Sequence, residues 1–461
     1  MAKKYDLLII GAGPAGIFTA YESIKLNPNL SILIIDKGHT LSKRKCPISQ
    51  GKSHKCMNCK VCSIMNGFGG AGAFSDGKYN ITNNFGGKLY EYIGREKAIE
   101  LMRYVDDINS SYGGKDTKIY STKGSSIKKL AMQNGLNLLD AEVRHLGTDV
   151  NYTVLSNMYD YLKDKADFLF DEDVTKVLPS PNQDRLFSVY TNLSIDPVIC
   201  KKLVIAAGRS GSKWLGGVCS DLGIKTTSNK VDIGVRVELP SEIFDHITSE
   251  VYEGKLVYKT EKYSDLVRTF CMNPHGIVVS ECTNGIITVN GHSYDDRNRF
   301  TENTNFAILV SNRFTKPFKD SNKYGEYIAG LSNMLGGGIL VQQFGDLIKG
   351  QRSTESRIKK SFVTPTLSAE PGDLSLVLPK RHLDNIIEMI YALDKIAPGT
   401  ANPSTLLYGV EVKFYNSEVE VNKNLETCIE NLYIIGDGSG VTHSLSHASA
   451  SGIHVARKMK W

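Results

Sequence analysis

The sequence predicts an α/β fold in which a domain with a parallel sheet is interrupted by an inserted α+β domain built on a mostly antiparallel sheet. The chain opens with an apolar strand, a glycine-rich turn and a helical pattern at residues 5–24. Alternating apolar runs fill its middle, and near its end another strand enters a second glycine-rich turn at 432–440. β-α-β patterns predict parallel strands, and short alternating runs predict antiparallel ones. We therefore assign residues 1–224 and 406–461 to one discontinuous domain, and residues 225–405 to the insertion.

The first turn reads G-x-G-x-x-G between a strand and a helix, which is the context of a dinucleotide-binding fingerprint. Gly11 permits the tight turn, Gly13 lets the backbone approach a pyrophosphate, and Gly16 lets the helix pack on the strand. The helix begins beside Pro14 and Ala15, and its N-terminus offers N–H groups to the pyrophosphate. We expect all five residues to bind the cofactor of a Rossmann-type domain.

The second strand ends in an acid. Residues 31–35 are apolar, and Asp36 follows them, twenty residues after Gly16. A carboxylate at this place binds the ribose hydroxyls of an adenosine. We expect Asp36 and the adjacent Lys37 to contact that end of the cofactor.

The glycine-rich turn near the end of the chain predicts the other end of the same cofactor. Gly436, Asp437 and Gly440 follow a strand and precede a helix. Asp437 can accept from ribityl hydroxyls, and the positive end of the next helix favours a reduced flavin. No second G-x-G-x-x-G follows a strand, so we expect resident FAD, with NAD(P)H as a transient reductant.

Two further segments have small residues that suit close backbone approach to a cofactor. One is the glycine-dense loop at residues 67–78, and the other is the end of the strand that reaches residue 207. The predicted contacts in these segments are Gly70, Ala71, Ser75, Asp76, Ala207 and Gly208.

Four cysteines cluster in the loop after the second strand, with the spacing C-x9-C-x2-C-x2-C: Cys46, Cys56, Cys59 and Cys62. Two consecutive x2 spacings resemble the run that holds a 4Fe-4S cluster. Four thiolates also suit a closed zinc site, and the last two form C-x-x-C, a redox-active dithiol pattern. Unligated cysteines on a basic loop are the fourth interpretation, and the spacing alone leaves all four open.

The candidate acid–base residues are His443 and His447, which lie four apart on one face of the last predicted helix. A proton donor beside a flavin is what hydride transfer to an unsaturated substrate requires. The alternative is that the two histidines cap and pack the helix. Weaker candidates, for anchoring an anionic substrate, are Arg236, Arg268, His275 and Arg352.

Composition is that of an ordinary globular protein: 461 residues, 41% hydrophobic and 23% charged, with a net charge of +6. The start of the chain is a strand and turn rather than an export signal, and no apolar run approaches the ~18 residues of a membrane span. We expect a cytoplasmic protein with reduced thiols. The basic stretch at residues 39–60 lacks interleaved aromatic residues, which favours a solvated loop over a nucleic-acid site.

Several segments together resemble the FAD-dependent dehydrogenase-like proteins of bacteria. The most specific is G-G-A-G-A-F-S-D-G-K at residues 69–78. The resemblance spans nearly the whole chain and implies a glutathione-reductase-like FAD fold with an inserted domain. That family commonly carries Arg and Gln where this chain has His443 and His447. The other segments are 11–16, 232–236, 268–271, 289–291, 343–346, 351–354 and 436–440.

The expected function is that of an FAD-dependent oxidoreductase. Hydride would pass between the flavin and a small organic molecule bound by the inserted domain. One alternative is an iron–sulfur flavoprotein that passes electrons between a ferredoxin-like carrier and its substrate. Another, less favoured, is an RNA-binding or RNA-modifying flavoprotein that uses the basic stretch.

Overall fold

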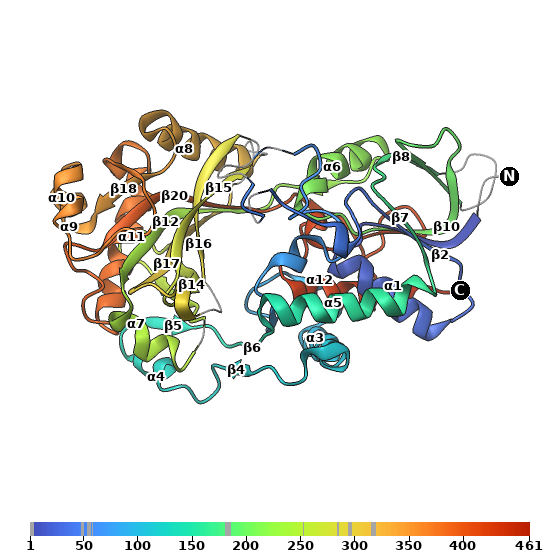
Figure 1. The fold of residues 1–461 in the computed structure, drawn as a ribbon, viewed down its shortest axis with the longest axis horizontal. Helices are drawn as coiled ribbons and strands as arrows, with labels where there is room; N and C mark the ends of the chain where they lie inside the picture. Colours follow the sequence, from blue (N-terminus) through green and yellow to red (C-terminus); the bar gives the residue numbers. More distant parts are fainter. Residues whose placement is uncertain are drawn as a thin grey trace. The chain divides into compact units, whose positions relative to one another are not determined.

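The chain forms two compact units in the computed structural model (Figure 1). Unit 1 comprises residues 1–120, 141–228 and 416–461, and unit 2 comprises residues 121–140 and 229–415. The structure describes residues 4–47, 50–52, 57, 59–179, 186–251, 253–283, 285–293, 297–314 and 320–461.

The described part of unit 1 is built on a seven-stranded, mostly parallel sheet. In spatial order its strands are β7 (Asp167–Phe170), β2 (Ile32–Asp36), β1 (Lys4–Ile10), β10 (Val198–Ile205), β9 (Phe187–Thr191) and β8 (Val174–Pro179), with β22 (Leu432–Ile434) also beside β10. The pairs β7–β2, β2–β1, β1–β10 and β10–β22 are parallel. β8 and β9 form an antiparallel meander on the first half of β10. The carboxyl ends of five strands therefore meet at one edge.

Alternate residues of these strands enter two hydrophobic cores. Leu7 and Ile9 of β1 pack against the helices of one face, whereas Leu8 and Ile10 pack on the other with the meander and α6 (Ser212–Asp221). The helices of the first face are α1 (Pro14–Leu26), α3 (Arg95–Asn109), α5 (Gly147–Lys163) and α12 (Leu445–Lys458). A sheet buried on both faces explains the near-continuous apolar runs in β1, β2 and β10.

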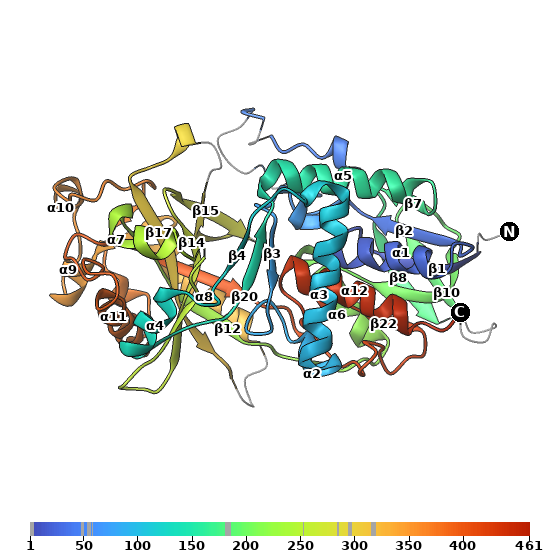
Figure 2. The same cartoon turned by 90° about the horizontal axis from the view of Figure 1, so that it is seen from below.

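Helix α12 packs tightly on α1, and α3 lies across it (Figure 2). A Cβ at Gly452 would stand 2.3 Å from the Ala15 carbonyl oxygen, so only glycine permits this approach. The buried Glu22 of α1 accepts from Arg457 Nε at 2.6 Å and from the Tyr104 hydroxyl at 2.9 Å. The last helix of the chain thereby fixes the first one.

Unit 2 is built on an eight-stranded sheet in its described part, with antiparallel pairs except for β18–β19. In spatial order the strands are β19 (Glu370–Pro371), β18 (Leu340–Gln343), β20 (Leu406–Phe414), β12 (Val231–Pro240), β17 (Asn303–Asn312), β14 (Leu266–Asn273), β13 (Leu256–Lys259) and β5 (Leu136–Leu138). A hairpin of β15 (Ile277–Thr283) and β16 (Ile286–His292) contacts this sheet. The helices of unit 2 are α4 (Ser126–Gln133), α7 (Ser241–Thr248), α8 (Ser321–Gly336), α9 (Phe344–Ile348), α10 (Glu355–Lys359) and α11 (Lys380–Asp394).

The mostly parallel sheet of unit 1 and the largely antiparallel sheet of unit 2 confirm the predicted α/β fold class. The unit boundaries lie elsewhere than the predicted 224/225 and 405/406. β20 pairs with β12 and β18, which keeps the chain in unit 2 until residue 415. Residues 121–140 belong to unit 2 because β5 pairs with β13.

Unit 1 also contains α2 (Leu89–Ile93) and two short antiparallel strand pairs. These are β3 (Lys78–Ile81) with β6 (Glu142–His145), and β11 (Thr226–Thr227) with β21 (Glu418–Val419). Within the described ranges, no helix combines the length and the apolar character that a bilayer crossing requires.

Candidate functional site

The first glycine-rich turn joins β1 to α1 at the carboxyl edge of the unit 1 sheet. Gly11 has a φ of +108°, and a Cβ there would stand 2.5 Å from the Ala206 carbonyl oxygen. A Cβ at Gly16 would stand 2.0 Å from the Gly11 carbonyl oxygen. Pro14 opens α1 and no side chain caps this end, so the first-turn N–H groups are left to a ligand or solvent. This is the local geometry of an anion site at a helix N-terminus.

Asp36, predicted to bind ribose hydroxyls, also organises the backbone of the site. Its Oδ2 accepts from Ala12 N, and its Oδ1 accepts from both Gly38 N and Gly67 N, each at 2.8 Å. A carboxylate has about four acceptor positions, so one on Oδ2 remains for a ligand hydroxyl. Lys37 donates to a protein carbonyl, that of Ser210, at 3.3 Å.

Arg44 holds the loop that follows the cysteines. Its Nε donates to Ser63 O at 2.9 Å, its Nη1 to Phe68 O at 2.6 Å, and its Nη2 to Ile64 O and Gly70 O at 2.8 Å each. The side chain is 4% exposed, and burial lowers the pKa of Arg44 to about 10, which leaves it charged at neutral pH. The interpretation of this basic stretch as a solvated loop is therefore wrong for Arg44, because four carbonyl groups replace water around its guanidinium.

The loop held by Arg44 packs its glycines on the first turn. Gly69 N donates to Ala12 O at 2.8 Å, and a Cβ at Gly70 would stand 3.1 Å from the Gly13 Cα. Gly70 and Ala71 open a short 3₁₀ helix directly beside the turn. Two glycine-rich segments far apart in sequence thus form one surface of backbone.

Ser75 and Asp76 lie just beyond this surface and are engaged locally. The Ser75 hydroxyl donates to Gly72 O at 2.8 Å, and Asp76 Oδ2 pairs with Lys78 Nζ at 2.7 Å. No described contact links either of them to the first turn. Their predicted role toward a cofactor stays a prediction.

The end of β10 and the glycine-rich turn after β22 lie side by side. Gly438 N donates to Ala207 O at 2.8 Å, because β22 pairs in parallel with β10. Gly436 and Gly440 have φ values of +75° and +70°. Gly208 has nothing within 4 Å of where its Cβ would stand, so its backbone is open to a ligand.

Asp437 and His443 form a chain of polar contacts at the end of β22. Asp437 Oδ1 lies 3.2 Å from His443 Nδ1, and its Oδ2 lies 2.9 Å from Arg209 Nε. Burial raises the pKa of Asp437, but the hydrogen bond from His443 and the charge of Arg209 outweigh it and hold that pKa below its usual value. The carboxylate is therefore ionised, and it orients the imidazole.

A pocket of about 470 Å³, including its open mouth, lies at the carboxyl ends of β1, β2 and β10. Its lining includes Asp36, Glu172, Asp173, Gly208 and Trp214. Trp214 Nε1 is buried, and no described residue accepts a hydrogen bond from it. Because buried donors in native proteins nearly always have partners, this N–H is expected to serve a ligand or water.

His447, the second predicted acid–base residue, is 0% exposed. Its Nε2 lies 2.8 Å from Thr82 O, which can only accept, so Nε2 carries the proton. Its Nδ1 is buried with no hydrogen-bond partner among the described residues. Burial lowers the pKa of His447 to about 4. The structure therefore favours the alternative interpretation for His447, in which this histidine packs the helix. His443 remains as the candidate proton carrier.

Acidification is expected to destabilise unit 1 through His447. Its folded pKa of about 4 lies below the unfolded value of about 6.5, so the unfolded chain binds more protons and stability falls as the pH falls between these values. Both tryptophans lie in unit 1, so urea unfolding followed by tryptophan fluorescence reports on this unit. The loss of unfolding free energy from about pH 7 to about pH 5 should be about 2 kcal/mol smaller in His447→Gln than in the wild type. Equal losses would contradict a buried neutral imidazole.

The predicted metal site of four cysteines can be followed only in part, because Cys56 lies outside the described residues. Cys46 and Cys62 are partly buried and Cys59 is exposed. In the ranges that the structure describes, no group of three or more His, Cys, Asp or Glu is placed to hold a metal ion. The cluster, zinc and dithiol interpretations stay predictions.

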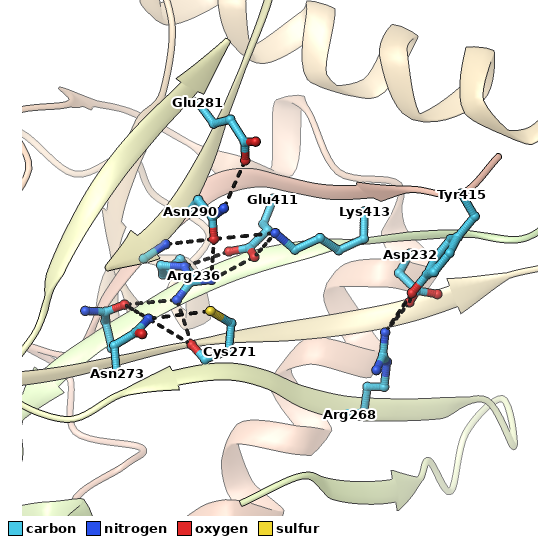
Figure 3. A network of polar contacts seen from close by, with 12 residues as sticks. Asp232, Arg236, Arg268, Cys271, Asn273, Glu281, Asn290, Glu411, Lys413 and Tyr415 are labelled. Carbon is cyan, nitrogen blue, oxygen red and sulfur yellow. Dashed lines mark hydrogen bonds and ion pairs between the residues drawn. The ribbon is translucent and has the colours of Figure 1, made fainter. Parts of the chain in front are cut away.

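One face of the unit 2 sheet carries buried charges (Figure 3). In β12, Asp232, Arg236 and Glu238 alternate with apolar residues that pack with α7 and α11, and all three are 0% exposed. Glu411 of the neighbouring β20 is 0% exposed as well. Asn290 of the β15–β16 hairpin contacts this charged face from above.

Arg236, a candidate anchor for an anionic substrate, is instead fully used inside the protein. Its Nε and Nη2 pair with the two Glu411 oxygens at 2.7 and 2.8 Å. Its Nη1 donates to Cys271 O and Asn305 Oδ1, and its Nη2 also contacts Asn290 Oδ1 at 3.3 Å. All five N–H donors thus have partners. Arg236 organises the site and has no donor left for a substrate.

Arg268, in contrast, has N–H donors that its described contacts within the protein do not use. Its Nη2 contacts Asp232 Oδ2 at 2.5 Å and the Tyr415 hydroxyl at 3.0 Å. Its Nε is buried, with no hydrogen-bond partner in the described part of the chain. Burial opposes ionisation of Asp232, but Arg268 and Lys230 overcome it and lower the pKa of Asp232 to about 2.

The remaining two candidate anchors lie apart from this network. His275 stacks on Phe300, with ring centroids 5.3 Å apart, and its Nδ1 lies 3.1 Å from Thr301 O. Arg352 is exposed. Sequence reasoning missed Arg44, Trp214, Glu411 and Lys413, none of which belongs to a motif.

The family description "FAD-dependent protein, C-terminal domain-like" matches residues 230–414, which is the larger segment of unit 2. An uncharacterised protein of Clostridium beijerinckii is 26% identical over 475 residues, covering 97% of this chain and 79% of that protein.

Among solved structures, glycine oxidase from Geobacillus kaustophilus is similar with a TM-score of 0.41 and 9% identity, over 99% of this chain and 96% of that one. NikD, an amino acid oxidase of nikkomycin biosynthesis, is similar with a TM-score of 0.42 and 11% identity, over 99% of this chain and 94% of that one. A quinol fumarate reductase of E. coli is similar with a TM-score of 0.38 and 14% identity, over 99% of this chain and 70% of that one.

Proposed function

We propose that the chain binds FAD in unit 1 and catalyses two-electron oxidation or reduction of a small organic molecule. The observation that carries the proposal is the surface of backbone at the carboxyl edge of the sheet, with the pocket beside it. The first turn and the Gly70 segment form this surface, and Trp214 Nε1 is an unpartnered buried donor in the pocket lining. The family description of residues 230–414 supports FAD as the cofactor.

The residues present fit FAD from end to end. The N-terminus of α1 suits the pyrophosphate, and the pocket with Asp36 and Trp214 suits the adenosine. The segment from Gly436 to Gly440 suits the flavin end. When bound, FAD supplies a reversible acceptor of two electrons. In this proposal Asp437 orients His443, which exchanges a proton with the substrate through Nε2.

The direct test is the cofactor content of the purified protein. An absorption spectrum and chromatography of the extracted cofactor should show FAD rather than FMN. Iron, acid-labile sulfide and zinc, measured on the same sample, address the four cysteines. Protein that is isolated without flavin and takes up no added FAD would rule out the proposed function.

Replacement of Trp214 is expected to weaken FAD binding without unfolding the protein. One lost hydrogen bond corresponds to about threefold to tenfold in affinity, so Trp214→Phe should raise the Kd for FAD by that factor. In a Trp461→Phe background Trp214 is the sole tryptophan, so its fluorescence should change as apoprotein takes up FAD. FMN, which lacks the adenosine, is the control ligand, and Trp214→Phe should leave its affinity unchanged. An unchanged Kd for FAD would exclude this contact.

A further inference from the structure

Three cations surround one aromatic ring in unit 2. The ring centroid of Phe270, in β14, lies 4.7 Å from Lys255 Nζ, 4.9 Å from the Arg268 guanidinium carbon and 5.6 Å from Lys413 Nζ. The negative ring face attracts each cation, but the cations repel one another at this spacing. Phe270, Arg268 and Lys413 are only partly buried, so this cluster borders solvent.

The carboxylates near the ring are each shared between cations. Glu411 contacts both Arg236 and Lys413, the latter at 3.1 Å. Asp232 contacts Arg268 at 2.5 Å and Lys230 at 3.6 Å. Each of these carboxylates can neutralise one of its two partners, which leaves positive charge close to Phe270.

The other acids of this face do not remove that charge. Glu253 pairs with Lys255 at 3.2 Å. Glu281 lies at the exposed edge and accepts from Asn290 at 2.9 Å (Figure 3). Glu238 accepts from Thr366 and Tyr408, among other neutral groups, farther along β12.

An unpartnered donor points to the same place independently. Arg268 Nε is buried without a partner among the described residues, although Asp232 and Tyr415 hold the Nη2 of the same guanidinium. A buried N–H of a charged group that makes no hydrogen bond carries a free-energy cost, and a bound anion would accept a hydrogen bond from it.

We propose that Arg268, Phe270 and Lys413 bind the substrate as an organic anion. The carboxylate of the ligand takes donors of Arg268 and Lys413, and its apolar part lies on the Phe270 ring. Asp232 and Glu411 are positioning residues that hold the two cations in place. This inference rests on the proposed oxidoreductase function, for which it names the substrate class.

The test compares butyrate with butyramide, which has the same carbon chain but no charge. Ligand-observed NMR titration of the purified holoprotein, at constant ionic strength, should detect butyrate binding and no butyramide binding. Lys413→Met should weaken butyrate binding about tenfold to a hundredfold, the value of one charge-assisted hydrogen bond. Lys413→Arg should retain most of the affinity.

Two further variants keep the result interpretable. Lys359→Met makes the same substitution on α10, where Lys359 pairs with Glu355 on the protein surface, and should leave butyrate binding unchanged. Phe270→Leu should weaken butyrate more than acetate, because only butyrate has a chain to lay on the ring. If Lys413→Met does not fold, the Phe270→Leu and Lys413→Arg results decide the question.

Equal binding of butyrate and butyramide, or an unchanged affinity in Lys413→Met, would overturn the inference. FAD content measured on the same samples separates the two failures. Holoprotein with FAD but without butyrate selectivity refutes the anion site alone, whereas absence of FAD refutes the proposed function.

Discussion

Gly16→Ala is expected to lose FAD and to destabilise unit 1. A Cβ at this position would stand 2.0 Å from the Gly11 carbonyl oxygen and 3.1 Å from Ile9 Cγ2. The Gly11 carbonyl belongs to the turn itself and cannot rotate away like the end of a side chain, so α1 must move off the sheet. The N–H groups at the start of α1 then leave their place above the turn, and the pyrophosphate loses its site.

The measurement is the flavin-to-protein ratio after gel filtration, together with the free energy of unfolding. The ratio should fall from stoichiometric to near zero. The free energy of unfolding should fall by about 3 kcal/mol, because a well-packed site is overfilled. Wild-type values for both would show that the close approach of α1 to the turn is not required.

Gly217→Ala is the matched control. Gly217 lies in α6 of unit 1, exposed, with nothing within 4 Å of its Cβ position. Alanine there should leave the flavin content unchanged and stabilise the helix by up to about 1 kcal/mol. The contrast separates overfilling at Gly16 from the general effect of removing a helical glycine.

The sequence predicts this part of the site because it is local. The turn at residues 11–16 and the acid at position 36 follow from strand, turn and helix patterns only a few residues long. The turn at Gly436 follows from the same pattern at the end of another strand. Parallel strands bring such turns to one edge of a sheet, so the fold class implies that these segments meet.

Features that depend on long-range packing could not be predicted. Arg44 looks like one more cation of a basic stretch, yet carbonyls of residues 63–70 surround it. Only the folded loop shows that the positive charge has a structural use. The same holds for β5, whose three residues decide that 121–140 belongs to unit 2 by pairing with β13.

The charged face of unit 2 is the clearest example. The alternation of Asp232, Arg236 and Glu238 with apolar residues predicts a strand with one face in water. All three are fully buried, because the other strands and the β15–β16 hairpin supply partners for them. Alternation specifies which residues share a face, but not what covers that face.

Breaking the ion pair between Arg236 and Glu411 is expected to give the largest loss of stability in unit 2. Both side chains are 0% exposed, and the pair is bidentate. Burial opposes the charge of each, yet each holds the other ionised: the pKa of Glu411 is lowered and that of Arg236 is raised. Removing Glu411 leaves the buried guanidinium of Arg236 without its counter-charge, at a cost of about 3–5 kcal/mol. Removing Arg236 leaves Glu411 with Lys413 as its remaining counter-charge.

The experiment is a double-mutant cycle of Arg236→Met and Glu411→Gln. Hydrogen exchange of peptides from β12 and β20 reports on unit 2, while tryptophan fluorescence reports on unit 1. Each single variant should speed exchange in unit 2 and leave the tryptophan transition in place. Lys359→Met, at an exposed pair, should change neither signal.

The double variant discriminates between two explanations of the loss. If the cost comes from a buried charge left alone, the double variant is less destabilised than the sum of the single variants, because neither charge remains unpaired. If it comes from lost packing, the two effects add. A sub-additive result would show that the loss of stability in each single variant comes mainly from the charge that is left behind, so that Arg236 and Glu411 are replaced at lower cost together than one at a time.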